Sequence, residues 1–295
     1  MRIPDPQEPR PHVAWPTVAL LAFAIGLWAG SSALWLTGQW PWWISTLLNA
    51  LAAYLLFTVA HEAAHHAAAE RGGLNLWIGR LAMPLFSAHS SFPVFRFVHM
   101  QHHRFTNHDD GRDPDHYTMA GPPWQRLPRW LTIDLQYIVF YLPHRGRRPA
   151  AELREQAGAM GAFLAVVVAS ILTGNLVALL VLLVLPARIA VVYLAWAFDY
   201  LPHKGLHLTP SEDRFKTTRN RIGLEWLITP LLLYQNYHLV HHLHPVIPFY
   251  RYLAVWRRGE DRYLDGDPEL STVRGRPVTP EEYRRMRELA AHDGH

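Results

Sequence analysis

Two long stretches without any charged side chain constrain the fold of this chain more than any other feature. Residues 14–61 and 156–187 contain no Lys, Arg, Asp or Glu. A helix needs roughly 20 apolar residues to cross the hydrocarbon core of a bilayer. The first stretch can hold two such helices with a break at 38–41, and the second opens a helix that breaks at 173–175. A fourth helix then continues through Arg188 to about residue 198. Because soluble folds rarely contain such stretches, the sequence predicts four membrane-spanning helices.

The predicted fold class is an all-α integral membrane protein, with four transmembrane helices in two hairpins and a cytosolic helical cap. We expect a single domain with five parts. These are a flexible arm (1–13), a first hairpin (14–60), a cytosolic and interfacial insert (61–155), a second hairpin (156–200), and a cytosolic cap with a tail (201–295). Prolines or charges interrupt apolar segments at 74–97 and 127–142, which predicts interfacial pieces there. Further helices are expected near 224–237 and at 280–292.

The placement of charges predicts the orientation. The hairpin tips carry no charge, whereas Lys and Arg gather in the arm, the middle segment and the last third of the chain. The positive-inside rule then places both termini and the insert in the cytoplasm, most simply at a bacterial inner membrane.

The formal net charge of +4 is mild and the basic residues form no long run, so we expect no nucleic-acid partner. The chain has no Cys, which excludes disulfides and a cysteine-bound iron–sulfur cluster.

Three histidine clusters point to metal chemistry. The first is His61-Glu-Ala-Ala-His65, and two further segments, at 99–103 and 238–242, each read His-x-x-His-His. On a helix, residues i, i+3 and i+4 share one face, so each cluster can present several imidazoles to one metal centre. At the histidine frequency of this chain, the His-x-x-His-His pattern is expected by chance about 0.08 times. It occurs twice, so we interpret the clusters as metal sites.

The number of histidines favours two metal ions. Imidazole suits zinc, copper, iron and nickel, but a zinc site normally takes only three or four protein ligands. An iron pair accepts electrons and reacts with oxygen, whereas zinc has no redox chemistry. The Glu-x-x-His motifs of soluble di-iron bundles do not occur in pairs here, so a di-iron site would be of a histidine-rich type. Two alternatives stay open: a zinc protease using His61-Glu62-x-x-His65, with Glu62 as general base, and a metal-binding membrane protein without catalysis.

At these clusters the sequence resembles the membrane fatty-acid desaturase and hydroxylase superfamily, and within it the desaturase-like bacterial β-carotene hydroxylases. The resemblance covers roughly residues 55–255. The histidine boxes are specific to the superfamily, and the strings Phe-Asp-Tyr-Leu-Pro-His and Gln-Asn-Tyr-His-Leu-Val-His-His are specific to the subgroup. The matching segments are 92–103, 113–116, 198–203, 235–245 and 247–250.

The resemblance implies a set of metal ligands and of residues that support them. Asp199, Glu62 and Asn236, together with Asp113, are the residues it suggests for orienting ligands or contacting the metal through water. The chain departs from the hydroxylases at Ala69, where they have a further His. Whether His66 or His207 contacts metal is left open. The implied ligands are His61, His65, His99, His102, His103, His203, His238, His241 and His242.

The resemblance also implies an activity. Two non-haem iron ions would use O2 to hydroxylate the β-ionone ring of a carotenoid, as in conversion of β-carotene to zeaxanthin. A fatty-acyl lipid desaturase using the same di-iron site is the nearest alternative. The substrate would be a membrane lipid or carotenoid. Because the chain has no Cys and no recognisable haem domain, electrons would come from a separate ferredoxin-like or cytochrome partner, for which the basic face offers a docking surface.

Overall fold

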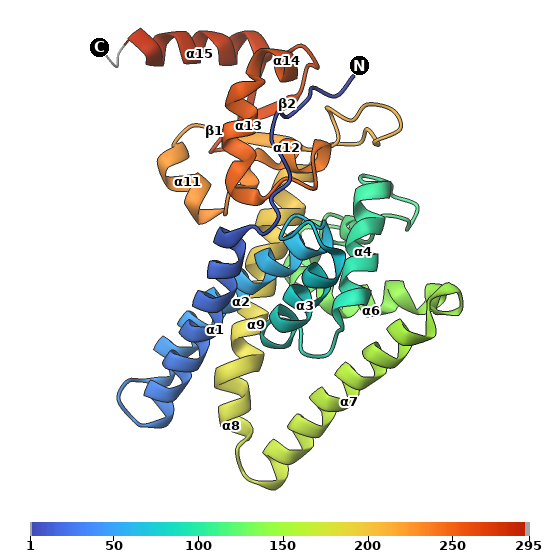
Figure 1. The fold of residues 1–295 in the computed structure, drawn as a ribbon, viewed down its shortest axis with the longest axis vertical. Coiled ribbons are helices and arrows are strands. Elements are labelled where there is room, and N and C mark those ends of the chain that lie inside the picture. Colours follow the sequence, from blue (N-terminus) through green and yellow to red (C-terminus); the bar gives the residue numbers. More distant parts are fainter. Residues whose placement is uncertain (1, 293–295) are drawn as a thin grey trace.

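Four apolar helices form one end of the molecule (Figure 1). The computed structural model describes residues 2–292, and among these residues four helices are long and apolar enough to cross a membrane. The predicted number of spans is therefore confirmed. The spans are α1 (Trp15–Leu36), α2 (Trp42–Ala64), α7 (Ala150–Leu172) and the helical run Leu176–His203.

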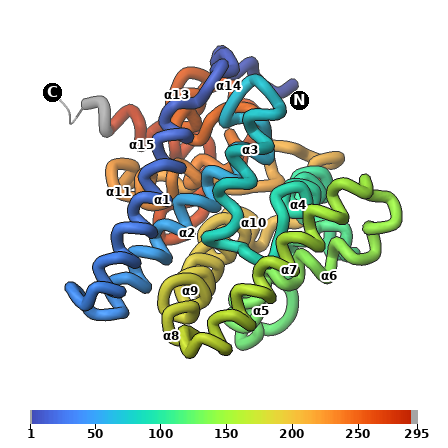
Figure 2. Tube along the Cα trace, turned by 60° about the horizontal axis from the view of Figure 1, so that its bottom comes forward, coloured from blue at the N-terminus to red at the C-terminus, as the bar shows by residue number. Residues whose placement is uncertain are grey.

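Glycines end the first and third spans at the predicted breaks. Gly38 follows α1 with a φ of +73°, and Gly174 follows α7 with a φ of +71°. This left-handed conformation costs a glycine little, because it has no Cβ. At the first break the chain turns back, so that α2 lies beside α1, whereas α7 and α8 (Leu176–Leu179) diverge from their shared end (Figures 1 and 2).

The fourth span is irregular and longer than predicted. A π-helical stretch, Leu180–Val184, joins α8 to α9 (Leu185–Leu194), and a second one, Ala195–Tyr200, joins α9 to α10 (Leu201–His203). The helix therefore runs five residues beyond its predicted end at residue 198. Single π-turns inside helices occur often at functional sites. Here the second one leads directly to His203.

The other helices are shorter and lie mainly between the spans and the far end of the molecule. The two predicted interfacial pieces each divide into two helices, α3 with α4 and α5 with α6. Pro84 lies in the 3₁₀ turn after α3, and Pro93 stands in the first turn of α4, where a missing N–H costs little. The helices are α3 (Gly72–Ala82), α4 (Phe92–Phe105), α5 (Arg126–Leu131), α6 (Ile133–Tyr141), α11 (Glu225–Leu231), α12 (His238–Leu243), α13 (Tyr252–Arg258), α14 (Glu260–Leu264) and α15 (Pro280–His292).

A small sheet corrects the prediction of an all-α fold. Strand β1 (Arg219–Ile222) pairs in parallel with β2 (Glu269–Thr272), which pairs antiparallel with β3 (Pro277–Val278). The strands have only two to four residues each, too few for a period-2 pattern to be recognised in the sequence. Pairing satisfies the backbone groups of a segment that is half-buried against the C-terminal core.

The helix predicted at 224–237 is also shorter than expected. Helix α11 ends at Leu231, and Leu233 and Tyr234 adopt positive φ values. A proline, Pro230, stands in the last turn of α11. Apolar composition alone suggested a continuous helix, but this chain reversal turns the following segment, which begins with Gln235, towards the histidines of α12.

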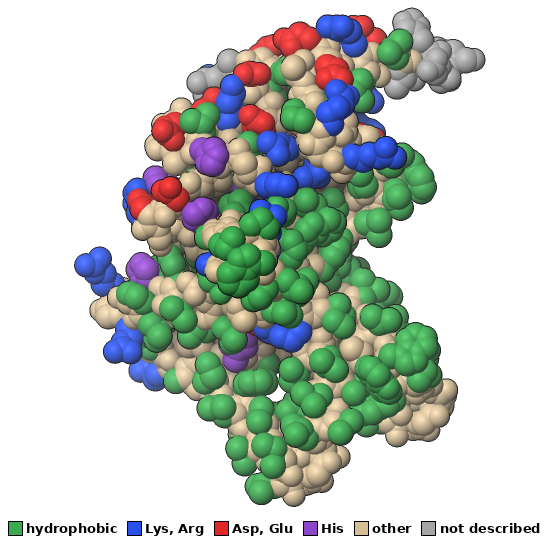
Figure 3. All heavy atoms as spheres, turned by 180° about the vertical axis from the view of Figure 1, so that it is seen from behind, with side chains coloured by type: hydrophobic (Ala, Val, Ile, Leu, Met, Phe, Trp, Pro, Cys, Tyr) green, Lys and Arg blue, Asp and Glu red, His purple; other side chains and the backbone are tan. Residues whose placement is uncertain are grey.

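The distribution of side chains separates an apolar end from a charged end. Apolar side chains cover the outside of the spans, whereas most acidic and basic side chains gather at the opposite end (Figure 3). Leu47 and Leu164 are each 54% exposed and Leu172 is 81% exposed, which is costly in water but not in lipid. Together with their lengths, these exposed apolar helices indicate a membrane protein.

Gly79 permits the close contact between α3 and α4. A Cβ built on Gly79 would lie 2.2 Å from Cε2 of Phe92, whose side chain is buried in the core. We expect Gly79→Ala to cost about 1–3 kcal/mol, as overpacking does, and to lower the melting temperature of the detergent-solubilised protein. Gly73→Ala in the same helix meets nothing within 4 Å and should be neutral or slightly stabilising. Equal melting temperatures for the two variants would contradict this account of the contact.

Candidate metal centre

The structure brings all nine predicted ligands together in two neighbouring groups of imidazoles. Within each group, one nitrogen of every ring lies within 4.8 Å of the others. Opposite ligands around an ion with bonds of roughly 2.1 Å lie roughly 4.2 Å apart, so this spacing fits a metal ion. The first group is His61, His65, His99, His103 and His241, and the second group is His102, His203, His238 and His242.

The first group gathers three helices around five Nε2 atoms. His61 and His65 are one turn apart at the end of α2, and His99 and His103 are one turn apart on α4. His241 of α12 completes the group. Its Nε2 lies 3.1 Å from that of His61 and 2.9 Å from that of His103. The Nε2 atoms of His65 and His99 are 2.7 Å apart.

The second group contains an imidazole nitrogen that has no hydrogen-bond partner among residues 2–292. Nε2 of His203 is buried and accepts no hydrogen bond from the described residues, while its Nδ1–H donates to the Thr217 carbonyl at 3.1 Å. The ring of His203 lies 4.9 Å from that of His102 and 5.2 Å from that of His238. The Nε2 atoms of His238 and His242 are 3.1 Å apart. A buried nitrogen lone pair aimed at other imidazoles is costly unless a cation binds there.

Each His-x-x-His-His segment contributes to both groups, which its spacing alone does not predict. In α4 the residues four apart, His99 and His103, belong to the first group, and His102 belongs to the second. In α12 the division is reversed, with His238 and His242 in the second group and His241 in the first. The reason is geometric, because residues i and i+4 are nearly in line along a helix while i+3 lies to one side. The two segments thereby hold the groups next to each other.

Hydrogen bonds from outside the groups orient the rings. Nδ1–H of His102 donates to Asp113 at 2.9 Å, and Nδ1–H of His241 donates to the Tyr252 hydroxyl at 2.9 Å. In the same way His238 donates to the Gln235 side-chain carbonyl at 2.8 Å. An imidazole whose Nδ1–H is engaged in this way presents the lone pair of Nε2, the form that binds metal.

The residues expected to support the ligands differ in what they contact. Glu62 accepts a hydrogen bond from the backbone N–H of Phe249 at 3.0 Å and one from the Tyr252 hydroxyl at 3.4 Å, so it acts on His241 through Tyr252. Asp113 contacts His102 directly, as expected. Asn236 donates instead to the Arg221 carbonyl and to Thr229. Within residues 2–292, Asn236 forms no hydrogen bond with an imidazole. It stabilises the chain reversal before α12.

Sequence reasoning missed the roles of Gln235, Tyr252 and Thr217. Gln235 carried a local signal, since it precedes His238 by three residues and therefore lies on the same side of the chain. Tyr252 lies eleven residues beyond His241 and reaches it only because α13 folds back on α12. Thr217 acts through its backbone carbonyl, which has no sequence signal.

Electrostatics keep most of these rings neutral. Burial, followed by repulsion from neighbouring rings, lowers the pKa of His65, His99 and His103, and likewise of the three α12 ligands, well below its usual range. For His102 burial also acts to lower the pKa, but Asp115 and Asp113 outweigh it and raise the pKa to about 9. The carboxylates thus favour positive charge at this ring, and the same field favours a metal cation at Nε2.

The donor set fits redox-active ions. The two groups offer five and four imidazole nitrogens, so a six-coordinate ion would keep positions free for other ligands. All nine donors are nitrogen, which suits iron, copper, nickel or zinc and disfavours calcium or magnesium. Five ligands exceed the usual four of a structural zinc site. The residues present therefore fit a pair of transition-metal ions.

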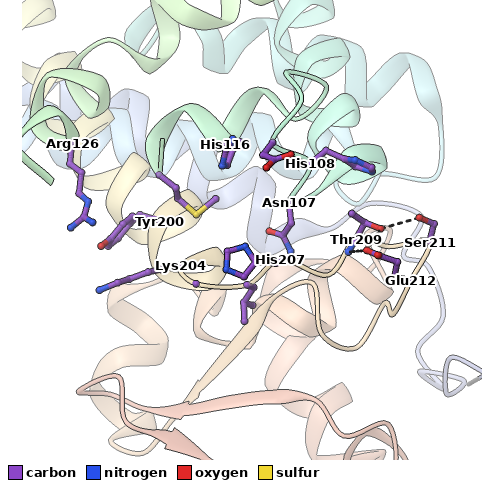
Figure 4. A pocket seen from close by; sticks show the side chains of 14 residues that line it. Asn107, His108, His116, Arg126, Tyr200, Lys204, His207, Thr209, Ser211 and Glu212 are labelled. Carbon is purple, nitrogen blue, oxygen red and sulfur yellow. Dashed lines mark hydrogen bonds between the residues drawn. The ribbon is translucent and has the colours of Figure 1, made fainter. Parts of the chain in front are cut away.

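Three of the histidines outside both groups lie close in sequence to the predicted ligands. His66 follows α2 with a positive φ, and His244 shares a 2.7 Å hydrogen bond with the Tyr263 hydroxyl. His207 lines a polar pocket of about 770 Å³, together with Lys204 and Arg126 (Figure 4). Neither His66 nor His207 offers a nitrogen to the two groups.

A small, mostly apolar cavity adjoins the first group. Phe57, Phe86 and Phe95 line it. The ring of Phe57 lies 6.0 Å from that of His61, and the ring of Phe95 lies 5.9 Å from that of His99. Asp199 lines this cavity, and it forms no hydrogen bond with an imidazole within residues 2–292. An apolar group held here would lie beside the ligands of the first group.

The comparisons with known proteins agree with this site. The sequence profile of the family described as fatty acid desaturase matches residues 37–273. A β-carotene ketolase from Paracoccus sp. is 28% identical over 206 residues, which cover 70% of this chain and 75% of the relative. A second β-carotene ketolase, from another Paracoccus strain, is 29% identical over 66% of this chain and 71% of the relative. A dihydrorhizobitoxine desaturase from Bradyrhizobium elkanii is 27% identical over 71% of this chain and 66% of the relative.

Proposed function

Because the chain belongs to the fatty acid desaturase family and is therefore an enzyme of the oxygenase and desaturase type, we propose that it hydroxylates the β-ionone ring of carotenoids. The observation that carries this proposal is the pair of imidazole groups beside an aromatic cavity. The nine histidines would hold two iron ions, and these ions would bind O2 and pass electrons to it. The overall reaction is R–H + O2 + 2 electrons + 2 protons → R–OH + H2O. A separate redox protein would supply the electrons.

The residues of the cavity would position the substrate and exclude water. The cavity has a volume of only about 40 Å³, so Phe57, Phe86 and Phe95 would turn aside to admit an apolar ring next to His61 and His99. An unactivated C–H bond reacts only when its carbon is held close to the oxidant, and a dry site limits side reactions. Tyr137 also lines this cavity, and its hydroxyl donates to Asp115 at 2.6 Å, so this hydroxyl is engaged away from the substrate.

The relatives support an oxidised carotenoid ring. Two are named β-carotene ketolases, and a ketone forms when one carbon is hydroxylated twice and the product loses water. A hydroxylase and a ketolase therefore share the same type of first step, the hydroxylation of a ring C–H bond. The third relative is named a desaturase, and desaturation of an acyl chain would remove a second hydrogen where hydroxylation adds oxygen. It is the second candidate function.

The geometry around Glu62 disfavours a zinc protease. A general base in such an enzyme faces a water molecule on the metal, whereas Glu62 is fully buried and engaged by Phe249 and Tyr252. The protease would also use only His61 and His65 of the nine clustered rings. A metal-binding protein without catalysis would need no aromatic cavity beside its metal ions.

We also propose an orientation of the protein in the membrane. The four spans would form two hairpins in a bacterial inner membrane, with both termini and the imidazole groups in a cap on the cytoplasmic side. The charged end of the molecule carries the Lys and Arg residues expected there (Figure 3).

The proposed function is tested by expressing the chain in a bacterial host that accumulates β-carotene and analysing pigments and lipids by mass spectrometry. We expect ring-hydroxylated carotenoid, with zeaxanthin as the end product, and none from the His103→Ala variant. Ring ketones as the only products would keep the oxygenase but change the assigned product. New acyl double bonds without any carotenoid change would overturn the carotenoid assignment.

A further inference from the structure

An open cleft exposes ligands of both imidazole groups to solvent. The cleft has a volume of about 510 Å³, and its lining includes His103 and His242. His103 belongs to the first group and His242 to the second, and their rings stack with centroids 4.2 Å apart. A molecule seated in this cleft would touch a ligand of each metal site at once.

The cleft carries positive charge that the protein does not neutralise. Arg104 and Arg214 line it, both are exposed, and neither forms an ion pair within residues 2–292. The described lining contains no carboxylate. In contrast, the larger polar pocket beside His207 includes Asp109 and Glu212 in its lining (Figure 4). Of these two openings, the cleft is the one suited to an anionic partner.

The position of the cleft indicates a partner that arrives from water. Its walls come from α4, α12, the segment at 210–217 and the N-terminal arm at Ile3, rather than from the lipid-facing sides of the spans. Thr217, which also lines the cleft, accepts the hydrogen bond from His203 through its carbonyl. Two of the nine predicted ligands therefore line the cleft, and a third, His203, lies behind Thr217.

We propose that this cleft is the docking surface for an acidic one-electron carrier protein, whose carboxylates pair with Arg104 and Arg214 over the rings of His103 and His242. The proposal rests on the proposed function, which consumes two electrons for each O2. Two reduced carriers are oxidised in turn, each giving up one electron, and the protons come from water. Contact with ligand rings of both groups keeps the electron-transfer distance short for either site.

The test measures binding of a plant-type [2Fe–2S] ferredoxin, and of the acidic soluble domain of a cytochrome b5, to the full-length protein in detergent. The variants are Arg104→Gln, Arg214→Gln and the double variant, with Arg274→Gln as control because Arg274 is exposed and lies outside the cleft. We expect the Kd for at least one carrier to rise roughly tenfold in the double variant, with a weaker dependence on salt. The Arg274 variant should bind like the wild type. The same shift is expected with metal-free protein.

Turnover distinguishes docking from damage to the metal site. Product formation driven by the carrier should fall with binding, whereas product formation driven by dithionite and the iron content should stay unchanged. Unchanged Kd values in the double variant, or no binding of either carrier to the wild type, would overturn the proposal. Binding to phosphatidylglycerol vesicles that depends on Arg104 and Arg214, without carrier binding, would also overturn it. If carrier binding needs both arginines but the protein shows no oxygenase turnover, the docking surface is supported and the proposed function is refuted.

Discussion

Replacing His241 with alanine is expected to reduce bound iron from about two ions to about one per chain and to abolish product formation. His241 is the ligand that joins the segments around the first group, since its Nε2 lies within 3.1 Å of those of both His61 and His103. Its loss also leaves the Tyr252 hydroxyl without the imidazole that donates to it. Iron content and carotenoid products, measured on the same membrane preparation, check this prediction.

The matched control is His244→Ala. His244 is also buried, lies three residues further along the chain, and hydrogen bonds with Tyr263 rather than with another histidine. It should cost stability without changing the iron content per folded chain. If His244→Ala loses as much iron as His241→Ala, the division between ligands and neighbouring histidines is wrong.

Asp113→Asn is expected to lower the metal affinity of the second group by about 10- to 100-fold, with a similar loss of activity. The Asp113 carboxylate accepts from Nδ1 of His102 at 2.9 Å and from the backbone N–H groups of Asn107 and Asp115. An amide presents one oxygen instead of two and no negative charge, so the ring of His102 would be held less firmly. Titration with a metal-buffered iron solution measures the change in affinity.

Asp110→Asn is the control for this substitution. Asp110 lies in the same loop, but it is exposed and pairs with Arg112 at 2.6 Å. An exposed ion pair of this kind contributes little, so iron affinity and activity should match the wild type. Equal effects of the two substitutions would show that the loop, rather than the contact with His102, controls the metal site.

The parts of the fold that depend on long sequence patterns were predictable. Charge-free stretches of more than 30 residues leave few alternatives to membrane spans, and Gly38 and Gly174 mark the turns where two of them end. The sheet was not predictable, because strands of two to four residues depend on pairing between positions about 50 apart, such as Arg219 and Glu269. Likewise, no local sequence pattern predicts that Leu233 and Tyr234 adopt positive φ values and reverse the chain.

The gathering of these nine histidines was predictable, because it follows from their spacing and from the resemblance. The residues around them were not, since their roles depend on contacts between distant segments. Tyr252 reaches His241 across a turn, and Glu62 reaches Phe249 across 187 residues. His102 belongs to one group and His99 to the other because of how α4 and α12 are rotated relative to each other. The sequence pattern of a single helix does not predict this rotation.

The proposed activity requires two adjacent redox-active ions held by these nine imidazoles. Anomalous X-ray diffraction at the iron edge, on crystals of the purified wild-type protein, tests it most directly. We predict two iron peaks in each molecule, one among His61, His65, His99, His103 and His241 and one among His102, His203, His238 and His242. A single zinc peak at His61 and His65, or iron located away from these rings, would contradict it.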